Sequence, residues 1–280
     1  MTTFHSDAAE TQSIEGTSAR FAYRRLGPES GVPFILCLRL RGTIDHWDPA
    51  LLDVLASERH VIVFDNRGTG RSSGTTPNTF DGLADGLLEF IDALGLSQVD
   101  LLGWSMGGYV VQVATLLRPT LVRQLIVAGS GPGRFPGLPV APEKVWQVAS
   151  KPENSDEDFL YLFFPETDTA RQAGLASLRR LNTRLTASHA EVSPQAVEAQ
   201  LAAIRSFGTG VWDRLGELTL PVLIANGLHD VMIDAYASYA MAQRLPNAKV
   251  ILYSDAGHGF LFQHPEEFGH DVLRFLREHH

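Results

Sequence analysis

Serine, histidine and aspartate, the residue types that together activate a hydroxyl nucleophile, stand in three turns that are far apart in this sequence. Ser105 is at the centre of GWSMG, His258 lies in GHG, and Asp230 ends NGLHD. A serine hydroxyl is a poor nucleophile until an imidazole takes its proton, and a carboxylate holds that imidazole in the correct tautomer. The three residues therefore predict nucleophilic catalysis by Ser105, with His258 as the base and Asp230 as the orienting acid.

The turn around Ser105 has the pattern G-x-S-x-G between two regular elements. Residues 99–103 form an apolar run that predicts a strand, and residues 107–117 predict a helix. A serine that stands above a sheet on so tight a turn needs a strained backbone, and glycines two residues to either side avoid a clash. The pattern alone also fits a simple Gly/Ser turn, but its place directly after an apolar strand favours a nucleophile.

The histidine and the acid are chosen by their positions relative to predicted strands. The chain has 10 histidines, and only the turn around His258 combines flanking glycines with a preceding strand, at 249–253. Asp230 follows another strand, at 222–226, so both side chains are expected at one edge of the sheet. Asp255 is too close to His258 in sequence to face it and is expected to make a turn hydrogen bond.

The elements that must position these residues alternate as in an α/β protein with a mostly parallel sheet. A block without strand signals interrupts the alternation and predicts a helical cap over the sheet edge. We expect a first core part at 1–132, with residues 1–17 poorly ordered, a cap at 133–216 and a second core part at 217–280. The predicted strands are 21–26, 33–38, 61–64, 99–103, 122–128, 222–226 and 249–253, and the predicted helices are 79–96, 107–117, 142–149, 156–164, 168–184, 194–207 and 265–278.

The order Ser, Asp, His, each just beyond a strand, resembles the α/β-hydrolase superfamily over nearly the whole chain from about residue 18. The segment DNRGTGRS at 65–72 is similar to the D-x-R-G-x-G-x-S turn of that family. The resemblance implies an eight-stranded, mostly parallel sheet flanked by helices, with a helical cap between strands six and seven.

One segment departs from the family pattern. Members usually carry His-Gly after the third strand, and the N–H of the next residue completes the oxyanion hole. Here Leu38 and Arg39 take those two places when the chain is aligned through Gly42 and Trp47. By that alignment, the amides of Leu40 and Met106 are the expected oxyanion donors.

The basic residues of this segment raise a hypothesis about the substrate. Arg39 or Arg41 could hold a substrate carboxylate, and the alternative is that they pair with the nearby Asp45 or Asp48. Aromatic residues are the other candidates for substrate binding. Trp104, which precedes the nucleophile, is expected to border the site. The cap offers five more candidates, and for all five the alternative is packing within the cap: Phe163, Phe159, Phe164, Trp146 and Trp212.

Composition limits the remaining function classes. The formal charge is −9, and basic residues form no run longer than the doublets at 24–25 and 179–180, which argues against a nucleic-acid partner. Cys37 is the single cysteine, which precludes an intramolecular disulfide, and its apolar neighbours predict a buried, inert thiol. No apolar stretch approaches a membrane span or a signal peptide, so a soluble cytoplasmic protein is expected. No metal-ligand spacing of the H-E-x-x-H type is found, and the chemistry requires no metal or organic cofactor.

Taken together, the sequence predicts a serine hydrolase that cleaves a small carboxylic ester or lactone through an acyl-enzyme intermediate. The alternative is a ligand receptor on the same fold with little or no turnover, because the oxyanion segment is altered.

Overall fold

The computed structural model describes residues 4–188 and 191–278 of the chain. Its centre is an eight-stranded sheet with the strand order β1-β2-β4-β3-β5-β6-β7-β8. The pairs β1/β2 and β2/β4 are antiparallel and all other neighbours are parallel, as the α/β pattern predicts. The strands are β1 (Gln12–Glu15), β2 (Arg20–Leu26), β3 (Phe34–Cys37), β4 (Val61–Phe64), β5 (Val99–Trp104), β6 (Val122–Ala128), β7 (Val222–Gly227) and β8 (Ala248–Tyr253).

The central strands are buried on both faces because they are continuous apolar runs. Every residue of β3, β4, β5 and β7 is buried, and two apolar clusters fill the two sides of the sheet. Cys37 ends β3 inside this core, where burial raises the pKa of its thiol. The expectation of an inert thiol is therefore consistent with its surroundings.

Helices cover both faces of the sheet. One face is covered by α1 and α10, and the other by α2, α3 and α8. The helices are α1 (Pro49–Ala56), α2 (Phe80–Ala93), α3 (Met106–Leu117), α4 (Glu143–Ala149), α5 (Asp156–Phe163), α6 (Asp168–Ser188), α7 (Pro194–Ser206), α8 (Tyr236–Ala242), α9 (Phe260–Gln263) and α10 (Pro265–Glu278), with 3-10 turns η1 (His5–Ala8), η2 (Ile44–His46) and η3 (Trp212–Glu217).

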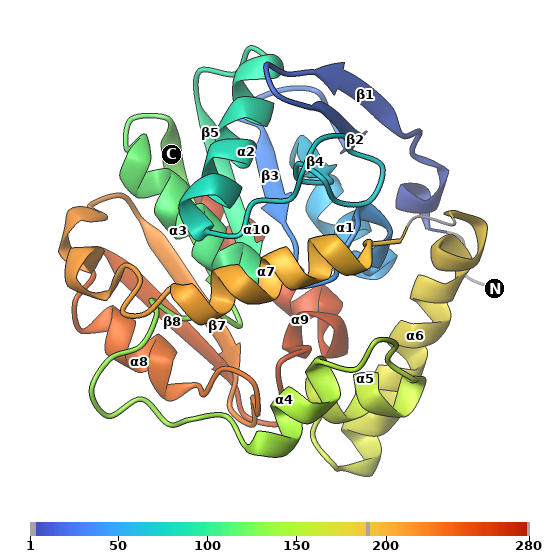
Figure 1. Cartoon of the computed structure of the whole chain (residues 1–280), viewed down its shortest axis with the longest axis vertical. Helices are drawn as coiled ribbons and strands as arrows, with labels where there is room; N and C mark the ends of the chain where they lie inside the picture. The colour runs from blue at the N-terminus through green and yellow to red at the C-terminus, as the bar shows by residue number, and fades with distance from the viewer. Residues whose placement is uncertain (1–3, 189–190, 279–280) are drawn as a thin grey trace.

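The helical block between β6 and β7 is present as expected. In the described part of that segment, the regular elements are α4 to α7 and η3. Figure 1 shows α4, α5 and α6 together at one end of the molecule, with α7 crossing in front of the sheet. We use the term cap for residues 133–216.

From residue 4 on, the start of the chain is more regular than expected, and residues 1–3 lie outside the described residues. Residues 12–15 form β1, which pairs along its length with β2, and residues 5–8 form η1. The strand has a polar sequence, three of its four residues are exposed, and it gains its regular structure from the ladder with β2 rather than from its own apolar pattern. Such an edge strand has no alternation of apolar and polar residues from which it could be predicted.

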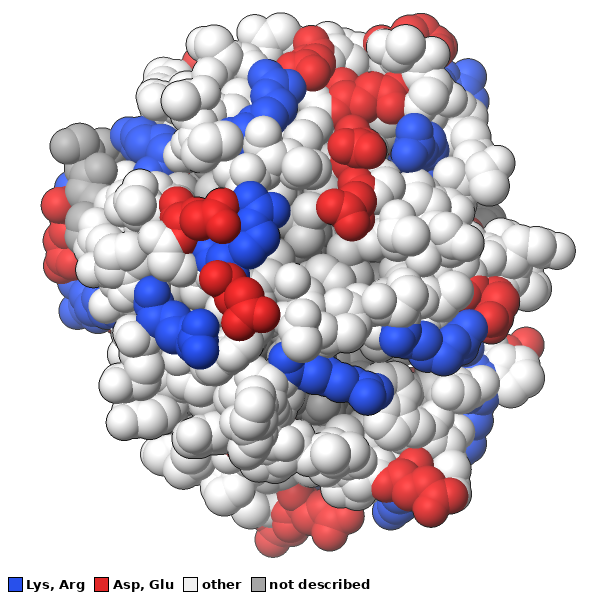
Figure 2. All heavy atoms as spheres, turned by 60° about the vertical axis from the view of Figure 1, so that its left-hand side comes forward, with Lys and Arg blue, Asp and Glu red and all other residues white. Residues whose placement is uncertain are grey.

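The surface carries both signs of charge. Figure 2 shows acidic and basic side chains interspersed among large uncharged areas on one face. Across residues 4–188 and 191–278, none of the helices combines the length and the apolar character that crossing a bilayer demands.

A buried ion pair joins the cap to the core. The Nε and Nη2 atoms of Arg180, in α6, donate to the two carboxylate oxygens of Asp48 at 2.7 and 2.6 Å, and Ser177 donates to the same carboxylate. Asp48 is fully buried and also caps α1 through the amide of Ala50. Arg180 further donates to the carbonyl of Phe262 in α9, so one guanidinium ties three helices together.

We expect Arg180→Met to lower the free energy of unfolding by about 3 kcal/mol, because it leaves the Asp48 carboxylate buried without its cation. Urea unfolding followed by circular dichroism measures the change. The matched control is Arg205→Met, which removes an arginine from an exposed pair with Glu198 and should cost less than about 1 kcal/mol. Equal losses in the two variants would contradict the role assigned to the buried pair.

Candidate functional site

Ser105 lies at the junction of β5 and α3 in a strained backbone conformation. Its φ is 56° and its ψ is −121°, and it is one of two non-glycine residues with positive φ in the described chain. A Cβ at Gly103 would lie 2.2 Å from the carbonyl oxygen of Gly107, and a Cβ at Gly107 would lie 2.2 Å from that of Cys37. Both glycines of the turn are therefore required by close backbone packing, as the motif predicted.

Asp230 and His258 form a buried pair at the ends of β7 and β8. His258 Nδ1 lies 2.7 Å from Asp230 Oδ2, and both side chains are shielded from solvent. The other carboxylate oxygen, Oδ1, accepts hydrogen bonds from the amides of Met232 and Ile233. In a neutral imidazole whose Nδ1 donates to this carboxylate, Nε2 has a lone pair.

Several contacts bring the His258 loop to the turn of Ser105. Trp104, which precedes the serine, donates from Nε1 to the carbonyl of His258 at 3.0 Å, and the two rings are 5.6 Å apart. Gly129 follows β6, whose last carbonyl accepts from the Ser105 amide, and a Cβ at this glycine would lie 3.5 Å from His258 Nδ1. His258 Nε2 is buried and has no hydrogen-bond partner among the described residues, Ser105 included.

The competing acid is placed elsewhere. Asp255 is exposed, and its Oδ1 lies 3.0 Å from Nε2 of His264, outside the buried pair. Of the two aspartates considered for the acid, the structure thus brings only Asp230 to His258.

The segment after β3 runs beside the start of α3. The amides of Leu40 and Met106, the expected oxyanion donors, donate no hydrogen bond to any described residue. Arg39 fixes the peptide after Leu40, because its Nη1 donates to the Leu40 carbonyl at 2.7 Å. Arg41 has a φ of 59°, and its amide donates to Oε1 of Gln200 in α7.

The turn that resembles D-x-R-G-x-G-x-S supports this segment from the side. The carboxylate of Asp65 accepts from the amides of Ile44 and Arg71 at 2.8 and 2.9 Å, which fixes the chain just beyond Gly42. A Cβ at Gly70 would lie 2.3 Å from Asp65 Oδ2. Burial raises the pKa of Asp65 to about 6, even though both backbone hydrogen bonds lower it.

Two of the predicted aromatic residues border the buried pair. Trp104 has no exposed surface, and Phe163, at the end of α5 in the cap, lies 5.5 Å from the Trp104 ring and 5.5 Å from the His258 ring. The Phe163 carbonyl accepts from the amide of Gly259, so the cap is attached directly to the histidine loop.

The other cap aromatics pack differently. Phe159 packs against both Phe163 and Phe164. Trp212 stacks on Phe135, with ring centroids 4.1 Å apart, and Trp146 is 43% exposed. Packing within the cap therefore accounts for Trp212, and Trp146 faces solvent.

Arg39 packs against the same two rings. Its guanidinium carbon is 5.9 Å from the Trp104 ring centroid and 5.3 Å from that of Phe163, which are cation–π distances. The expected alternative, pairing with Asp45 or Asp48, is wrong for both arginines. Asp45 is held by Arg24 and Arg71, and Asp48 by Arg180.

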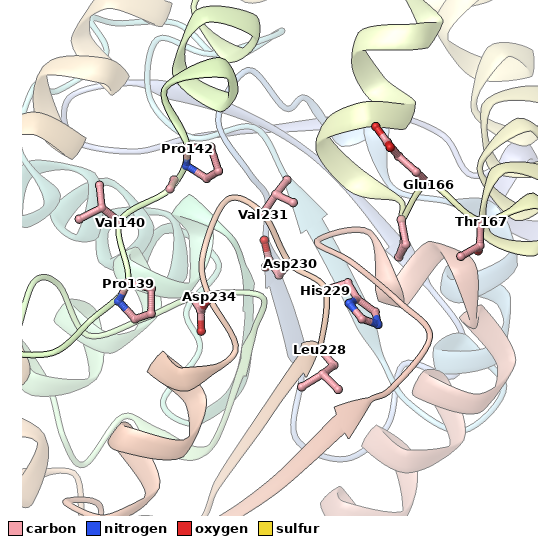
Figure 3. A pocket seen from close by; sticks show the side chains of 12 residues that line it. Pro139, Val140, Pro142, Glu166, Thr167, Leu228, His229, Asp230, Val231 and Asp234 are labelled. Carbon is pink, nitrogen blue, oxygen red and sulfur yellow. The ribbon is translucent and has the colours of Figure 1, made fainter.

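Two cavities lie near these residues. One of about 30 Å³ borders Arg39, Met106 and Gln200, which is room for about one water molecule. A larger recess of about 610 Å³ opens beside the loop of Asp230, between that loop and cap segments 139–142 and 165–167 (Figure 3). Asp230 lines this recess, but neither Ser105 nor His258 does, so the recess does not contain the proposed nucleophile or base. Ser105 itself is only 7% exposed.

Metal ligands do not gather at this site. Within the described ranges 4–188 and 191–278, no three His, Cys, Asp or Glu side chains are grouped so that they could hold a metal ion.

Residues 32–265 match the family model described as alpha/beta hydrolase fold. The relative "Putative carbamate hydrolase RutD" of Rhizobium rhizogenes is 28% identical over 251 residues, which cover 87% of this chain and 92% of that protein. A solved alpha/beta hydrolase fold protein from Chitinophaga pinensis is 38% identical, with a TM-score of 0.88 over 96% of this chain and 98% of that one. A thermophilic esterase from Thermogutta terrifontis, solved with malate bound, is 25% identical, with a TM-score of 0.78 over 97% of this chain and 100% of that one.

The close backbone packing around the turn of Ser105 can be tested by measuring protein stability. We expect Gly103→Ala to lower the free energy of unfolding by about 3 kcal/mol, because the new methyl group would meet backbone atoms at 2.2 Å that cannot move without displacing α3. Chemical unfolding in urea measures the loss.

The control for this test is Gly216→Ala, in η3, where an added Cβ meets nothing within 4 Å. It should stay within about 0.5 kcal/mol of the wild type. If Gly103→Ala were equally harmless, the close packing that holds Ser105 would be refuted.

Proposed function

Because this chain belongs to the alpha/beta hydrolase family, we propose that it is a serine hydrolase that cleaves a small carboxylic ester or lactone through an acyl-enzyme intermediate on Ser105. The observation that carries this proposal is the buried His258–Asp230 pair. Its Nε2 has no hydrogen-bond partner among the described residues, and its loop is hydrogen-bonded to Trp104, which precedes the positive-φ Ser105. A structural histidine would use both ring nitrogens, whereas a general base needs one nitrogen without a protein partner.

The residues divide the chemistry as follows. His258 Nε2 takes the Ser105 proton while the hydroxyl oxygen attacks the carbonyl carbon, and Asp230 stabilises the imidazolium through Nδ1. The amides of Leu40 and Met106 donate to the oxyanion of the tetrahedral intermediate. His258 then returns the proton to the leaving oxygen as the carbon–oxygen bond breaks. Water attacks the acyl-enzyme in the second half, with His258 again acting first as base and then as acid.

Ser105 Oγ has to approach His258 Nε2 before the proton can be transferred between them. Ser105 Oγ and His258 Nε2 make no hydrogen bond in this structure, and such bonds are often long before a substrate binds. The oxyanion donors support a catalytic role, because both amides have no partner among the described residues and Met106 begins α3, where the helix dipole favours negative charge.

The relatives support hydrolysis of a carbonyl compound. The one from Rhizobium rhizogenes is named for carbamates and the one from Thermogutta terrifontis is an esterase. Both reactions fit a serine nucleophile, and we favour esters and lactones because an alkoxide leaves more readily than an amide nitrogen.

A fluorophosphonate probe and 4-nitrophenyl acetate test the proposal together. We expect the wild type to be labelled at Ser105 and to turn over the ester repeatedly, while Ser105→Ala shows neither. His258→Gln and Asp230→Asn should each lower kcat/KM by on the order of 10⁴-fold, since they remove the base or its tautomer. Tryptic mass spectrometry locates the label.

His264→Gln is the matched control, because it also removes a histidine from an aspartate pair, but on the surface. It should keep its activity. Turnover that survives in Ser105→Ala would exclude the proposed nucleophile. A single acylation of the wild type without further turnover would favour a ligand receptor, the second reading of the altered oxyanion segment.

A further inference from the structure

Arg39 has a guanidinium with unused donors next to the proposed reaction centre. Within the described residues, this guanidinium makes one hydrogen bond, from Nη1 to the carbonyl of Leu40. Its Nε is buried without a partner, and its Nη2 donates to no described residue. A buried donor without an acceptor costs stability, so this arrangement needs an explanation.

The unused donors of Arg39, Nε and Nη2, form the edge of the guanidinium that binds carboxylates elsewhere in this protein. Arg180 donates to Asp48 through Nε and Nη2, and Arg123 donates to Asp100 through the same two atoms. This edge presents two parallel N–H groups that match the two oxygens of a carboxylate. On Arg39 the same edge has no acid from the described chain.

Neighbouring acids cannot neutralise this cation, because they are already paired. Asp45 lies between Arg24 and Arg71, and Asp48 is held by Arg180. Burial, together with the nearby positive charge of Arg41, lowers the pKa of Arg39 to about 10, which leaves the guanidinium charged at neutral pH. The local charge is thus positive in a chain whose formal charge is −9.

Arg39 and His258 contact the same two aromatic rings. The Trp104 and Phe163 rings, whose centroids are 5.5 Å apart, pack against each other, and both lie near the Arg39 guanidinium carbon, at 5.9 and 5.3 Å, and near the His258 ring, at 5.6 and 5.5 Å. Arg39 is also bonded in sequence to Leu40, a proposed oxyanion donor. The guanidinium of Arg39 therefore belongs to the same group of side chains as the proposed base and one proposed oxyanion donor.

We infer that Arg39 binds a carboxylate of the substrate through Nε and Nη2, so that the preferred substrate is an ester or lactone that carries a carboxylate. This inference rests on the proposed hydrolase function and narrows its substrate class. Trp104 and Phe163 hold the guanidinium in place, and the carboxylate supplies the counter-charge that the protein does not.

Isosteric pairs of substrates test the inference. Monoethyl adipate is compared with its terminal carboxamide, and acetoxyacetate with acetoxyacetamide, which place the charge on the acyl side and on the leaving side. Hydrolysis is followed by proton release. We expect the wild type to prefer at least one carboxylate over its amide, and Arg39→Gln to lower kcat/KM for that carboxylate by on the order of 100-fold while changing the amide less than about threefold.

Two further variants separate charge from structure. Arg39→Lys keeps the charge without the paired donors and should recover part of the loss, which also covers the case in which Arg39→Gln does not fold. Arg41→Gln removes the neighbouring charge, whose guanidinium already bonds to Pro152 and Asn154, and should leave the preference intact. Equal losses on the carboxylate and the amide, or no loss on either, would overturn the inference.

A binding measurement distinguishes a failure of the inference from a failure of the proposed function. Monoethyl adipate is titrated calorimetrically into Ser105→Ala and into the double variant Ser105→Ala with Arg39→Gln. Binding that needs Arg39 supports the carboxylate site even if the wild type hydrolyses no ester. Binding of equal strength in both variants refutes the site even if hydrolysis is observed.

Discussion

The backbone of Ser105 is the constraint on which the site depends. A non-glycine residue at a φ of 56° costs conformational energy and persists only when its surroundings fix it. They do so here because the end of β5, the start of α3 and the end of β3 pack at the limit of backbone contact, with glycines at 103 and 107 where a side chain would clash. The same contact fixes where the chain leaves β3. It therefore places Leu40 and Arg39 as well as the nucleophile.

The remaining groups are held by burial and by the cap. Asp230 accepts two amide hydrogen bonds and the imidazole, which fixes the orientation of His258 without any contact to solvent. The indole of Trp104 ties the histidine loop to the serine turn, and the carbonyl of Phe163 ties that loop to the cap. Since Ser105 is nearly enclosed, charges within the site are poorly screened, and each interaction there is stronger than it would be in water.

The sequence predicted what local chemistry determines. The glycine pattern around Ser105 and the positions of Asp230 and His258 after strands follow from short segments, and the structure places these segments together. It could not predict β1, whose polar residues become a strand only through pairing with β2. The sequence also could not predict that Arg180 pairs with Asp48, because Arg180 lies 132 positions away and reaches Asp48 only through the packing of α6 on α1. Proximity in sequence favoured Arg39 and Arg41 as its partners, and tertiary packing decided otherwise.

The unpaired charge of Arg39 also decides what a ligand at this place must supply. Burial, and after it the charge of Arg39, lower the pKa of His46 to about 3, so the field of this guanidinium acts on a neighbouring side chain. A buried cation without a counter-ion is unfavourable, and Asp45 and Asp48 are already paired with other arginines. A substrate that carries a carboxylate would supply the missing counter-charge, so part of its binding energy would come from neutralising a charge that the folded chain leaves without a partner.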